Sequence, residues 1–295
     1  MGKVALFLSP HLDDVVLSCP AYIQRLVKEG IEVRIVTVFT EADPGSAALY
    51  RARRVEDRKA IRELGASATH LGFPDAPFRS PRYRDFFGIV FGRAREYPGT
   101  RRLVAEKIGE LIGRWRPLQV VSPLAVGNHV DHRLVRDAAL LAVKPEEWLF
   151  YEDRPYAFVR EQVDHVLGRS MARPERFWRG YFAATYVRNY RGTTSDRRII
   201  KHWAAVPPFP SKIHKAFTVE TGPVELARTL AALRAYGTQM PDLFTDEAER
   251  ETLYGTVAET IYALVGRAIQ PADRLSSRSS RLKSGLQAGL PAPKR

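Results

Sequence analysis

The sequence predicts an α/β protein with a Rossmann-like, open and mostly parallel sheet flanked by helices. Short apolar runs without alternation are typical of strands buried on both faces of a parallel sheet, and "KVALFLS" (3–9) is the first of them. Segments with helical spacing follow these runs in turn, which favours parallel strands joined by crossover helices. The length of 295 residues suits one large α/β domain or two smaller ones.

The predicted elements alternate through the first half of the chain. The predicted strands are residues 3–9, 31–40, 68–73, 118–123 and 147–153. The predicted helices are residues 14–30, 46–66, 100–117 and 132–143. Gly30 and Gly65 end the first two, as expected for glycine at helix ends. Residues 74–99 are rich in proline and arginine and are predicted to form a loop.

After residue 153 this alternation weakens. Residues 154–220 combine arginine, aromatic residues and proline without a clear period, which indicates a cap-like insertion or an elaborated edge. Helical spacing returns at 222–237 and 246–268. The predicted organisation is a catalytic core over 1–153, an elaboration of the same domain over 154–270, and a disordered basic tail over 271–295.

The net charge of +13 is concentrated in two segments. Residues 154–202 carry 11 Lys and Arg against 4 Asp and Glu, and the tail carries 6 against 1, whereas residues 1–153 carry 23 against 20. A protein built only to bind nucleic acid would more often spread basic residues over its folded surface. We therefore interpret residues 154–202 as a basic surface that faces a bound anion, and the tail as solvated chain.

Cysteine content and hydropathy exclude further classes. The single cysteine, Cys19, excludes an internal disulfide framework and a metal site built from several cysteines. No apolar run is long enough to span a bilayer, and acids arrive by residue 13, too early for a signal peptide. We expect a cytoplasmic protein without a membrane span.

Acidic and imidazole side chains follow three of the predicted strands. "HLDD" (11–14) comes after the first strand, Asp75 after the third, and "NHVDH" (128–132) after the fourth. Ligands of open α/β sheets bind beyond the carboxyl ends of the strands. We therefore expect these side chains to converge on one rim of the sheet.

These two motifs contain a ligand set for a divalent ion. His11 and Asp14 can chelate an ion across three residues, and His132 can complete a facial triad. Two neutral nitrogens and one carboxylate suit zinc, with ferrous iron or another transition ion as the alternative. Because such an ion lowers the pKa of its bound water to roughly 7, we expect that water to be the nucleophile of a hydrolase.

Three neighbouring side chains complete the expected chemistry. Asp13 is the candidate general base, and His129 is placed to stabilise an oxyanion or to protonate a leaving amine. Asp131 is expected to orient an imidazole or to keep it protonated. Alone, a loop histidine is usually solvated and a pair of aspartates usually caps a helix. The presence of both motifs after parallel strands favours catalysis.

The motifs resemble those of a known family. "SPHLDDVVLS" and "GNHVDHRLV" are similar to the (A/S)-H-P-D-D-E and H-x-D-H signatures of the PIG-L/LmbE-like N-deacetylases. The resemblance continues in "RRVEDRKAIRELGA" and "LGFPDA", and more weakly in "ALRAYGTQ". It implies a Rossmann-like fold and hydrolysis of N-acetyl groups from amino sugars with a bound divalent metal, commonly zinc.

By position, the resemblance implies the same metal ligands, the same general base and the same role for His129 as acid or oxyanion partner. It also implies that Arg53 and Asp75 contact the sugar. Leu12 replaces the proline of the family signature, and Val15 replaces its glutamate, so any role of that carboxylate is missing here. The expected function is zinc-dependent removal of an acetyl group from an amino sugar or glycoconjugate. The basic segment mildly favours an anionic substrate.

Other classes of function agree less well with the sequence. The basic segment 154–202 motivates an anion-binding or nucleic-acid-binding protein with a relict metal site, although nucleic acid is the less favoured partner. The turn after the first strand lacks G-x-G-x-x-G, which argues against a dinucleotide-dependent enzyme. A D-x-D phosphotransferase would leave the pair His129 and His132 unexplained. The sequence does not specify the substrate, the metal in the cell or the oligomeric state.

Overall fold

One seven-stranded sheet organises the chain. The computed structural model describes residues 3–93, 98–142, 148–169, 174–210 and 212–265, and the strand order is β3-β2-β1-β4-β5-β7-β6. The strands are β1 (Val4–Ser9), β2 (Glu32–Glu41), β3 (Ser67–Pro74), β4 (Gln119–Pro123), β5 (Trp148–Tyr151), β6 (Ile213–Val219) and β7 (Glu259–Leu264). The first five strands are parallel, whereas β7 runs antiparallel to both β5 and β6. This confirms the predicted mostly parallel α/β sheet.

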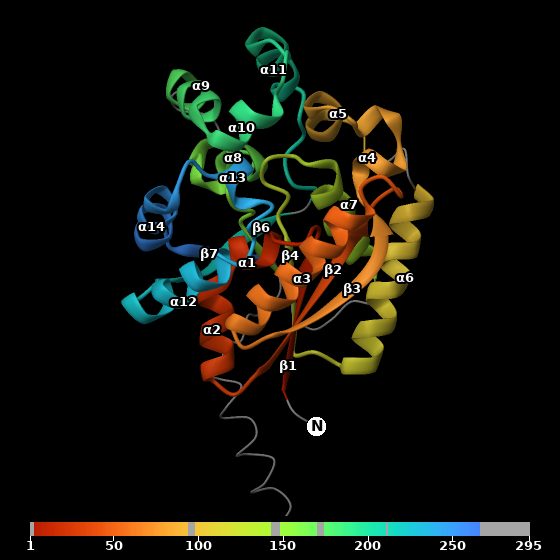
Figure 1. Cartoon of the computed structure of the whole chain (residues 1–295), viewed down its shortest axis with the longest axis vertical. Coiled ribbons are helices and arrows are strands. Elements are labelled where there is room, and N and C mark those ends of the chain that lie inside the picture. Colours follow the sequence, from red (N-terminus) through yellow and green to blue (C-terminus); the bar gives the residue numbers. More distant parts are fainter. Residues whose placement is uncertain (1–2, 94–97, 143–147, 170–173, 211, 266–295) are drawn as a thin grey trace, which may run out of the picture.

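Helices cover both faces of the sheet (Figure 1). Around the sheet lie α1 (Asp14–Ser18), α2 (Pro20–Lys28), α3 (Ala47–Glu63), α6 (Pro98–Trp115), α7 (Val130–Leu141), α8 (Arg160–Val166), α12 (Pro223–Leu233) and α14 (Glu247–Thr256). Strand β1 is buried along its whole length, with Ala5 and Phe7 in one apolar cluster and Leu6 and Leu8 in another. Because alternate residues of a strand point to opposite faces, a strand covered on both sides is apolar without alternation.

A group of shorter helices lies beyond the carboxyl ends of the parallel strands (Figure 1). It contains α4 (Ala76–Arg79), α5 (Phe86–Phe91), α9 (Pro174–Ala183), α10 (Thr185–Tyr190), α11 (Asp196–Trp203) and α13 (Met240–Leu243). Aromatic residues of α5, α9, α10 and α11, with Phe177 and Trp203 fully buried, form a separate apolar cluster. Much of the segment predicted to be a cap-like insertion therefore packs on its own core above the sheet edge.

Several predicted boundaries differ from the structure. The predicted helix 14–30 is two helices, because Pro20 has no N–H to continue α1 and instead begins α2. The predicted loop 74–99 contains α4, α5 and a 3-10 turn, Pro81–Tyr83. The predicted tail, residues 271–295, lies outside the described residues.

The predicted helix 246–268 is wrong in its second half. Helix α14 ends at Thr256, and strand β7 follows from Glu259. Ladder hydrogen bonds to β5 and β6 on either side satisfy the backbone of "ETIYAL", whose Thr, Ile and Tyr have high strand propensity. Within the described ranges, no helix is long and apolar enough to cross a bilayer.

Candidate active site

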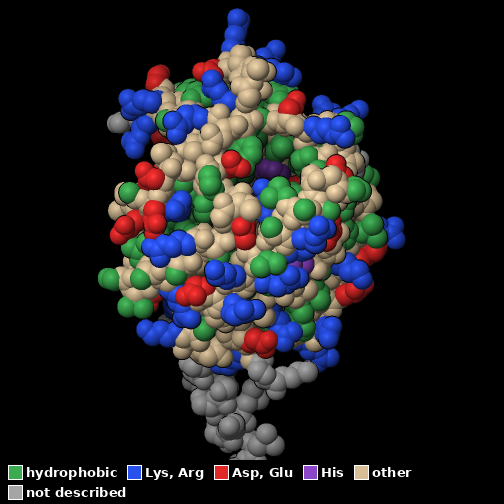
Figure 2. Space-filling model, in the orientation of Figure 1, with side chains coloured by type: hydrophobic (Ala, Val, Ile, Leu, Met, Phe, Trp, Pro, Cys, Tyr) green, Lys and Arg blue, Asp and Glu red, His purple; other side chains and the backbone are tan. Residues whose placement is uncertain are grey.

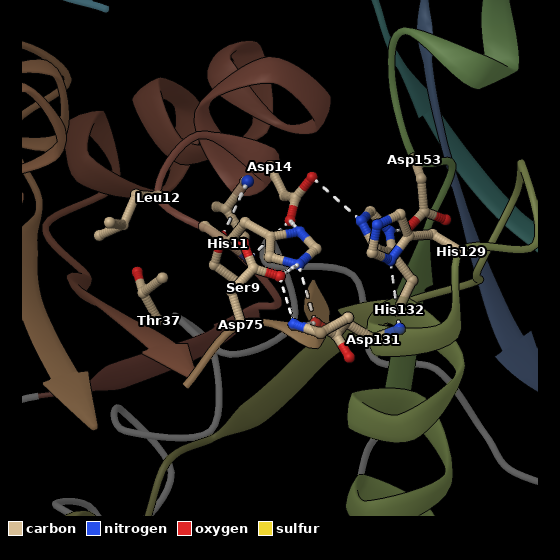
Figure 3. A network of polar contacts seen from close by, with 12 residues as sticks. Ser9, His11, Leu12, Asp14, Thr37, Asp75, His129, Asp131, His132 and Asp153 are labelled. Carbon is tan, nitrogen blue, oxygen red and sulfur yellow. Dashed lines mark hydrogen bonds and ion pairs between the residues drawn. The ribbon is translucent and has the colours of Figure 1, made fainter. Parts of the chain in front are cut away.

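The polar side chains that follow four parallel strands meet beyond the carboxyl ends of these strands (Figure 3). His11 follows β1, Asp75 follows β3, His129 and His132 begin α7 after β4, and Asp153 follows β5. The first four of these residues are the ones that the sequence predicts on a common rim. The structure brings them together because β1, β3, β4 and β5 run in the same direction.

Local hydrogen bonds hold the loop after β1 in shape. The Ser9 hydroxyl donates to the His11 carbonyl at 2.7 Å and accepts the Val15 N–H at 3.2 Å. From far along the chain, Gln239 Nε2 donates to the Leu12 carbonyl at 2.9 Å. The backbone that carries the two aspartates is therefore fixed from both sides.

Three imidazoles lie close together in this site. One nitrogen from each of His11, His129 and His132 can be chosen so that all lie within 4.8 Å of one another. The ring centroids of His11 are 4.8 Å from His129 and 5.3 Å from His132. Such spacing is suitable for ligands or neighbours of a single ion.

Asp14 lies between two of these imidazoles. Its Oδ2 is 3.1 Å from His11 Nδ1, and its Oδ1 is 3.3 Å from His132 Nε2. Burial opposes ionisation of Asp14, but His132 and His11 outweigh it and hold the pKa of Asp14 well below its ordinary value. The three residues predicted as metal ligands are thus in mutual contact.

His132 is oriented by a carboxylate on its other nitrogen. Asp153 Oδ1 lies 2.6 Å from His132 Nδ1, and Asp153 Oδ2 accepts the Val126 N–H at 2.8 Å. Burial lowers the pKa of His132, but Asp14 and Asp153 outweigh this effect and raise it to about 9. Asp153 is not among the candidate site residues of the sequence analysis, although its position at the end of a predicted strand is a signal that points to it.

The residues present fit a divalent metal ion. His132 Nε2 is buried and makes no hydrogen bond, although it faces Asp14, while its Nδ1 is held by a carboxylate. That is the usual arrangement of a metal-binding histidine and its outer partner. A second set of candidate ligands, His11, Asp75 and Asp131, shares His11 with the three imidazoles.

The side chain of Asp131 contacts His11 rather than the side chains of the histidines beside it in sequence. Its Oδ2 is 3.2 Å from His11 Nε2 and accepts the Ala76 N–H at 3.1 Å. The guanidinium of Arg79 forms two hydrogen bonds with the same carboxylate. Sequence reasoning missed Arg79, which lay in a segment predicted to be an irregular loop.

Asp13 has a different environment from Asp14. It occupies the N-cap position of α1, but its side chain makes no capping hydrogen bond, and it lines the cavity of the site. Burial and the adjacent Asp14 carboxylate raise the pKa of Asp13 to about 7, despite His11 and Arg53. A carboxyl group that is free of a capping role and titrates near neutrality suits a general base.

The hydrogen bond of His129 specifies which of its nitrogens carries the proton. His129 Nδ1 accepts the Asp131 N–H at 3.2 Å, so the neutral ring carries its proton on Nε2. Burial, together with the nearby His11 and His132, lowers the pKa of His129 well below its ordinary value. A neutral Nε2–H is a hydrogen-bond donor, which favours oxyanion stabilisation over protonation of the amine.

A cavity of about 810 Å³ opens over these residues. Figure 2 shows a histidine at the bottom of a hollow on this face of the molecule. Arg53 lines the cavity, with its guanidinium 5.4 Å from the centre of the Tyr50 ring. Asp75 also lines it, accepts the Tyr50 hydroxyl and the Ala76 N–H, and lies 3.4 Å from His11 Nε2.

The basic segment 154–202 reaches the cavity only in part. Arg191 and Arg198 line it, with Arg198 placed 3.9 Å from the centre of the Phe87 ring. Other arginines of the segment pair with nearby acids, as in Arg160–Glu152, Arg169–Asp164 and Arg176–Glu161. Arg154 is buried and donates to the carbonyls of Val257 and Ala258.

The two positions that depart from the family signature are both buried. Leu12 is 2% exposed, and Val15 packs in the apolar cluster beneath α1 and α2. A glutamate at position 15 would place a carboxylate in that cluster, where an unpaired charge is costly. The valine therefore matches its surroundings.

Comparison with known proteins identifies the family. A family profile described as "PIG-L: GlcNAc-PI de-N-acetylase" matches residues 6–143. A 2'-N-acetylparomamine deacetylase from Niallia circulans is 32% identical over 193 residues, covering 52% of this chain and 68% of the relative. The chain belongs to the PIG-L family.

The matched region of this PIG-L protein contains the histidines and aspartates from His11 to His132 but not Asp153. A 2'-N-acetylparomamine deacetylase from Streptomyces fradiae is 36% identical over 171 residues, which cover 54% of this chain. That alignment spans 60% of the relative's length, less than two thirds.

Solved structures support the fold over nearly the whole chain. The A40926 pseudoaglycone deacetylase Dbv21 has a TM-score of 0.57 at 22% identity, covering 90% of this chain and 98% of its own. A deacetylase of teicoplanin biosynthesis, solved with teicoplanin bound, has a TM-score of 0.58 at 23% identity and covers 91% of this chain and 100% of its own. The fold of the C-terminal half is therefore shared as well.

Proposed function

We propose that this protein is a metal-dependent hydrolase that removes an N-acetyl group from an amino sugar or glycoconjugate. The observation that carries the proposal is the position of Asp13, which lines the cavity without a capping hydrogen bond, beside His11 and Asp14, which line the same cavity. His132 contacts this Asp14. Membership of the PIG-L family and the names of both curated relatives support it.

We assign the divalent ion to His11, Asp14 and His132, with zinc as the expected ion. When bound, the ion supplies Lewis acidity and lowers the pKa of water near neutral pH. The Asp153 carboxylate keeps Nδ1 of His132 engaged, so that Nε2 is left for the ion. His129 remains the nearest alternative ligand, because its ring lies within the same group.

The chain's own residues account for the proton transfers of amide hydrolysis. The Asp13 carboxylate accepts a proton from the attacking water as the bond to the acetyl carbon forms. His129 Nε2–H donates a hydrogen bond to the acyl oxygen as negative charge develops there. Asp13 then passes its proton to the nitrogen as the C–N bond breaks. The carboxylic acid formed gives up its proton, and acetate and the protonated amine are released.

Arg53 and Asp75 remain candidates for contact with the sugar. Both line the cavity, but Asp75 already accepts hydrogen bonds from Tyr50 and Ala76, which leaves Arg53 the freer of the two. The guanidinium of Arg53 has a buried Nε without a hydrogen-bond partner. Asp131 is better assigned to holding His11 and Arg79 than to contact with substrate.

The substrate class is tested by mass spectrometry. We would incubate the purified protein, loaded with zinc, with 2'-N-acetylparomamine, N-acetylglucosamine and an N-acetylglucosamine phosphate conjugate, and measure loss of one acetyl group. Turnover of one of these sugars is expected, and the first is favoured by the names of the relatives. Failure to deacetylate any of them, with metal present, would contradict the proposal.

The anion-binding alternative receives little support from the structure. Several arginines of segment 154–202 already pair with carboxylates, and Arg154 is buried. Binding to polynucleotides should be weak at physiological salt and lost as salt rises. A cytoplasmic location stays a prediction.

A further inference from the structure

Tyr156 is a cavity-lining residue to which no role has yet been given. It follows Asp153 by three residues and lies in the 3-10 turn Tyr156–Phe158, beyond the region that the family profile matches. Its ring meets the His132 ring edge to face, with centroids 5.7 Å apart and an angle of 79°. It therefore lies next to a proposed metal ligand.

The ring of Tyr156 is held in place from several sides. Gly127 has φ +83°, and a Cβ at that position would lie 2.4 Å from Cγ of the Tyr156 ring. A side chain larger than hydrogen at position 127 would thus displace the ring. Tyr186 packs edge to face at 5.0 Å, and Gln162 Nε2 donates both to the Tyr156 carbonyl and to the Tyr186 hydroxyl.

The hydroxyl of Tyr156 differs from those of other tyrosines around the cavity. Tyr50 donates to Asp75, Tyr190 donates to Asp242 at 3.2 Å, and Tyr186 accepts from Gln162 at 2.6 Å. Among the described residues, the Tyr156 hydroxyl has no hydrogen-bond partner. The ring is held rigidly at the cavity and its hydroxyl has no protein partner among the described residues, which leaves that hydroxyl available to a ligand bound there.

We propose that Tyr156 is a catalytic residue whose hydroxyl donates a hydrogen bond to the acyl oxygen of the substrate, beside the His129 Nε2–H. This inference rests on the proposed deacetylase function. A donor that is already oriented costs no rearrangement when charge develops on the oxygen, and such donors act mainly on the transition state. The ring, locked over Gly127, supplies that fixed orientation.

The test is the variant Tyr156→Phe, which removes only the hydroxyl and keeps the ring that fills the space over Gly127. With zinc-loaded protein and 2'-N-acetylparomamine, we expect kcat to fall about 10²-fold, as when one oxyanion donor is lost, with KM changed less than about twofold. Zinc content and melting temperature should match those of the wild type. Tyr262→Phe is the matched control, because its hydroxyl donates to Glu152 away from the cavity, and it should keep the wild-type kcat.

Each outcome distinguishes the two proposals. An unchanged kcat in Tyr156→Phe, while the wild type is active, would overturn the role of Tyr156 and leave the proposed function intact. A raised KM with unchanged kcat would place the hydroxyl on another part of the sugar and would also overturn it. Wild-type protein that deacetylates none of the tested sugars would instead contradict the proposed function, and the role of Tyr156 with it.

Discussion

Two adjacent carboxylates, Asp13 and Asp14, acquire opposite properties from their surroundings. Asp14 lies between the imidazoles of His11 and His132, and its pKa is held far below the ordinary value. Asp13 gains no such partner, and burial beside Asp14 raises its pKa to about 7. Environments that separate the pKa values of neighbouring acids allow them different roles, here those of the proposed ligand Asp14 and the proposed base Asp13.

Asp13→Asn tests the role of the base. The amide cannot accept the proton from water, so we expect kcat to fall by about 10² to 10⁴-fold, the usual contribution of general-base catalysis. Zinc content, measured by elemental analysis, should stay near that of the wild type. The exposed Asp43→Asn is the control and should keep full activity. Normal turnover in Asp13→Asn would remove the assignment.

Substitution of His129 and of His132 distinguishes the proposed metal ligand from the proposed hydrogen-bond donor. His132→Ala should lose bound zinc and activity together, because its Nε2 is the nitrogen left open by the Asp153 contact. His129→Ala should keep zinc and lose turnover, because its assigned role is hydrogen bonding to the acyl oxygen. If His129→Ala lost zinc as well, the ion would instead be held by the three imidazoles.

At the scale of elements, strand β7 explains how the C-terminal half is joined to the first half of the chain. Its first residue, Glu259, accepts the N–H groups of Ala21 and Tyr22 at 2.6 and 2.8 Å. These N–H groups belong to the first turn of α2, which has no side-chain cap of its own. Arg154 lies nearby and donates to the two carbonyls just before Glu259.

The buried Glu259 makes stability depend on pH. Burial raises its pKa from 4.5 to about 7, although Arg154 and the two N–H groups oppose the shift. A group whose pKa is higher in the folded state stabilises the protein below its unfolded pKa, and this contribution is lost as pH rises through about 7. Relative to Glu259→Gln, the wild type should lose about 3 kcal/mol of unfolding free energy between pH 4.5 and 8.

Urea unfolding at several pH values measures this difference. The exposed Glu220→Gln serves as the control and should follow the wild type at every pH. Equal pH dependence of the wild type and Glu259→Gln would show that Glu259 does not titrate in this range.

At the scale of the whole molecule, the site joins segments that are far apart in the chain. His11, Asp75, His132 and Asp153 follow four different strands, and Gln239 connects α13 to the same loop through the Leu12 carbonyl. Several buried acids converge there, and they raise the pKa values of His11 and His132 despite the burial of both rings. A divalent ion would offset the charge of these acids and would bind only the folded chain.

Zinc should therefore raise the melting temperature. At a free concentration of 100 times Kd, binding to the folded state adds about 2.7 kcal/mol, which corresponds to a rise of about 5 °C for a domain of this size. Calorimetry with and without zinc measures the effect. His132→Ala should abolish the rise, whereas the exposed His214→Ala should retain it. An equal rise in His132→Ala would indicate a different binding site.

Much of the fold and the site follows from local features of the sequence. The unbroken apolar run of β1 and the motifs around His11 and His132 predicted a parallel sheet with polar groups at one edge, because strand burial and chain direction are encoded locally. Strand β7 could not be predicted in this way. Its residues follow a helix with similar spacing, and only pairing with β5 and β6 favours the extended form.

The sequence by itself determined which residue types stand at the ends of the strands, and hence the kind of chemistry available. Only the tertiary structure decided the individual contacts at the site: Asp153 on His132, Arg79 on Asp131, and Tyr156 over Gly127. Each of these contacts joins side chains from different segments. Their pKa values and free hydrogen-bonding groups depend on burial and on neighbours, which no single stretch of sequence contains.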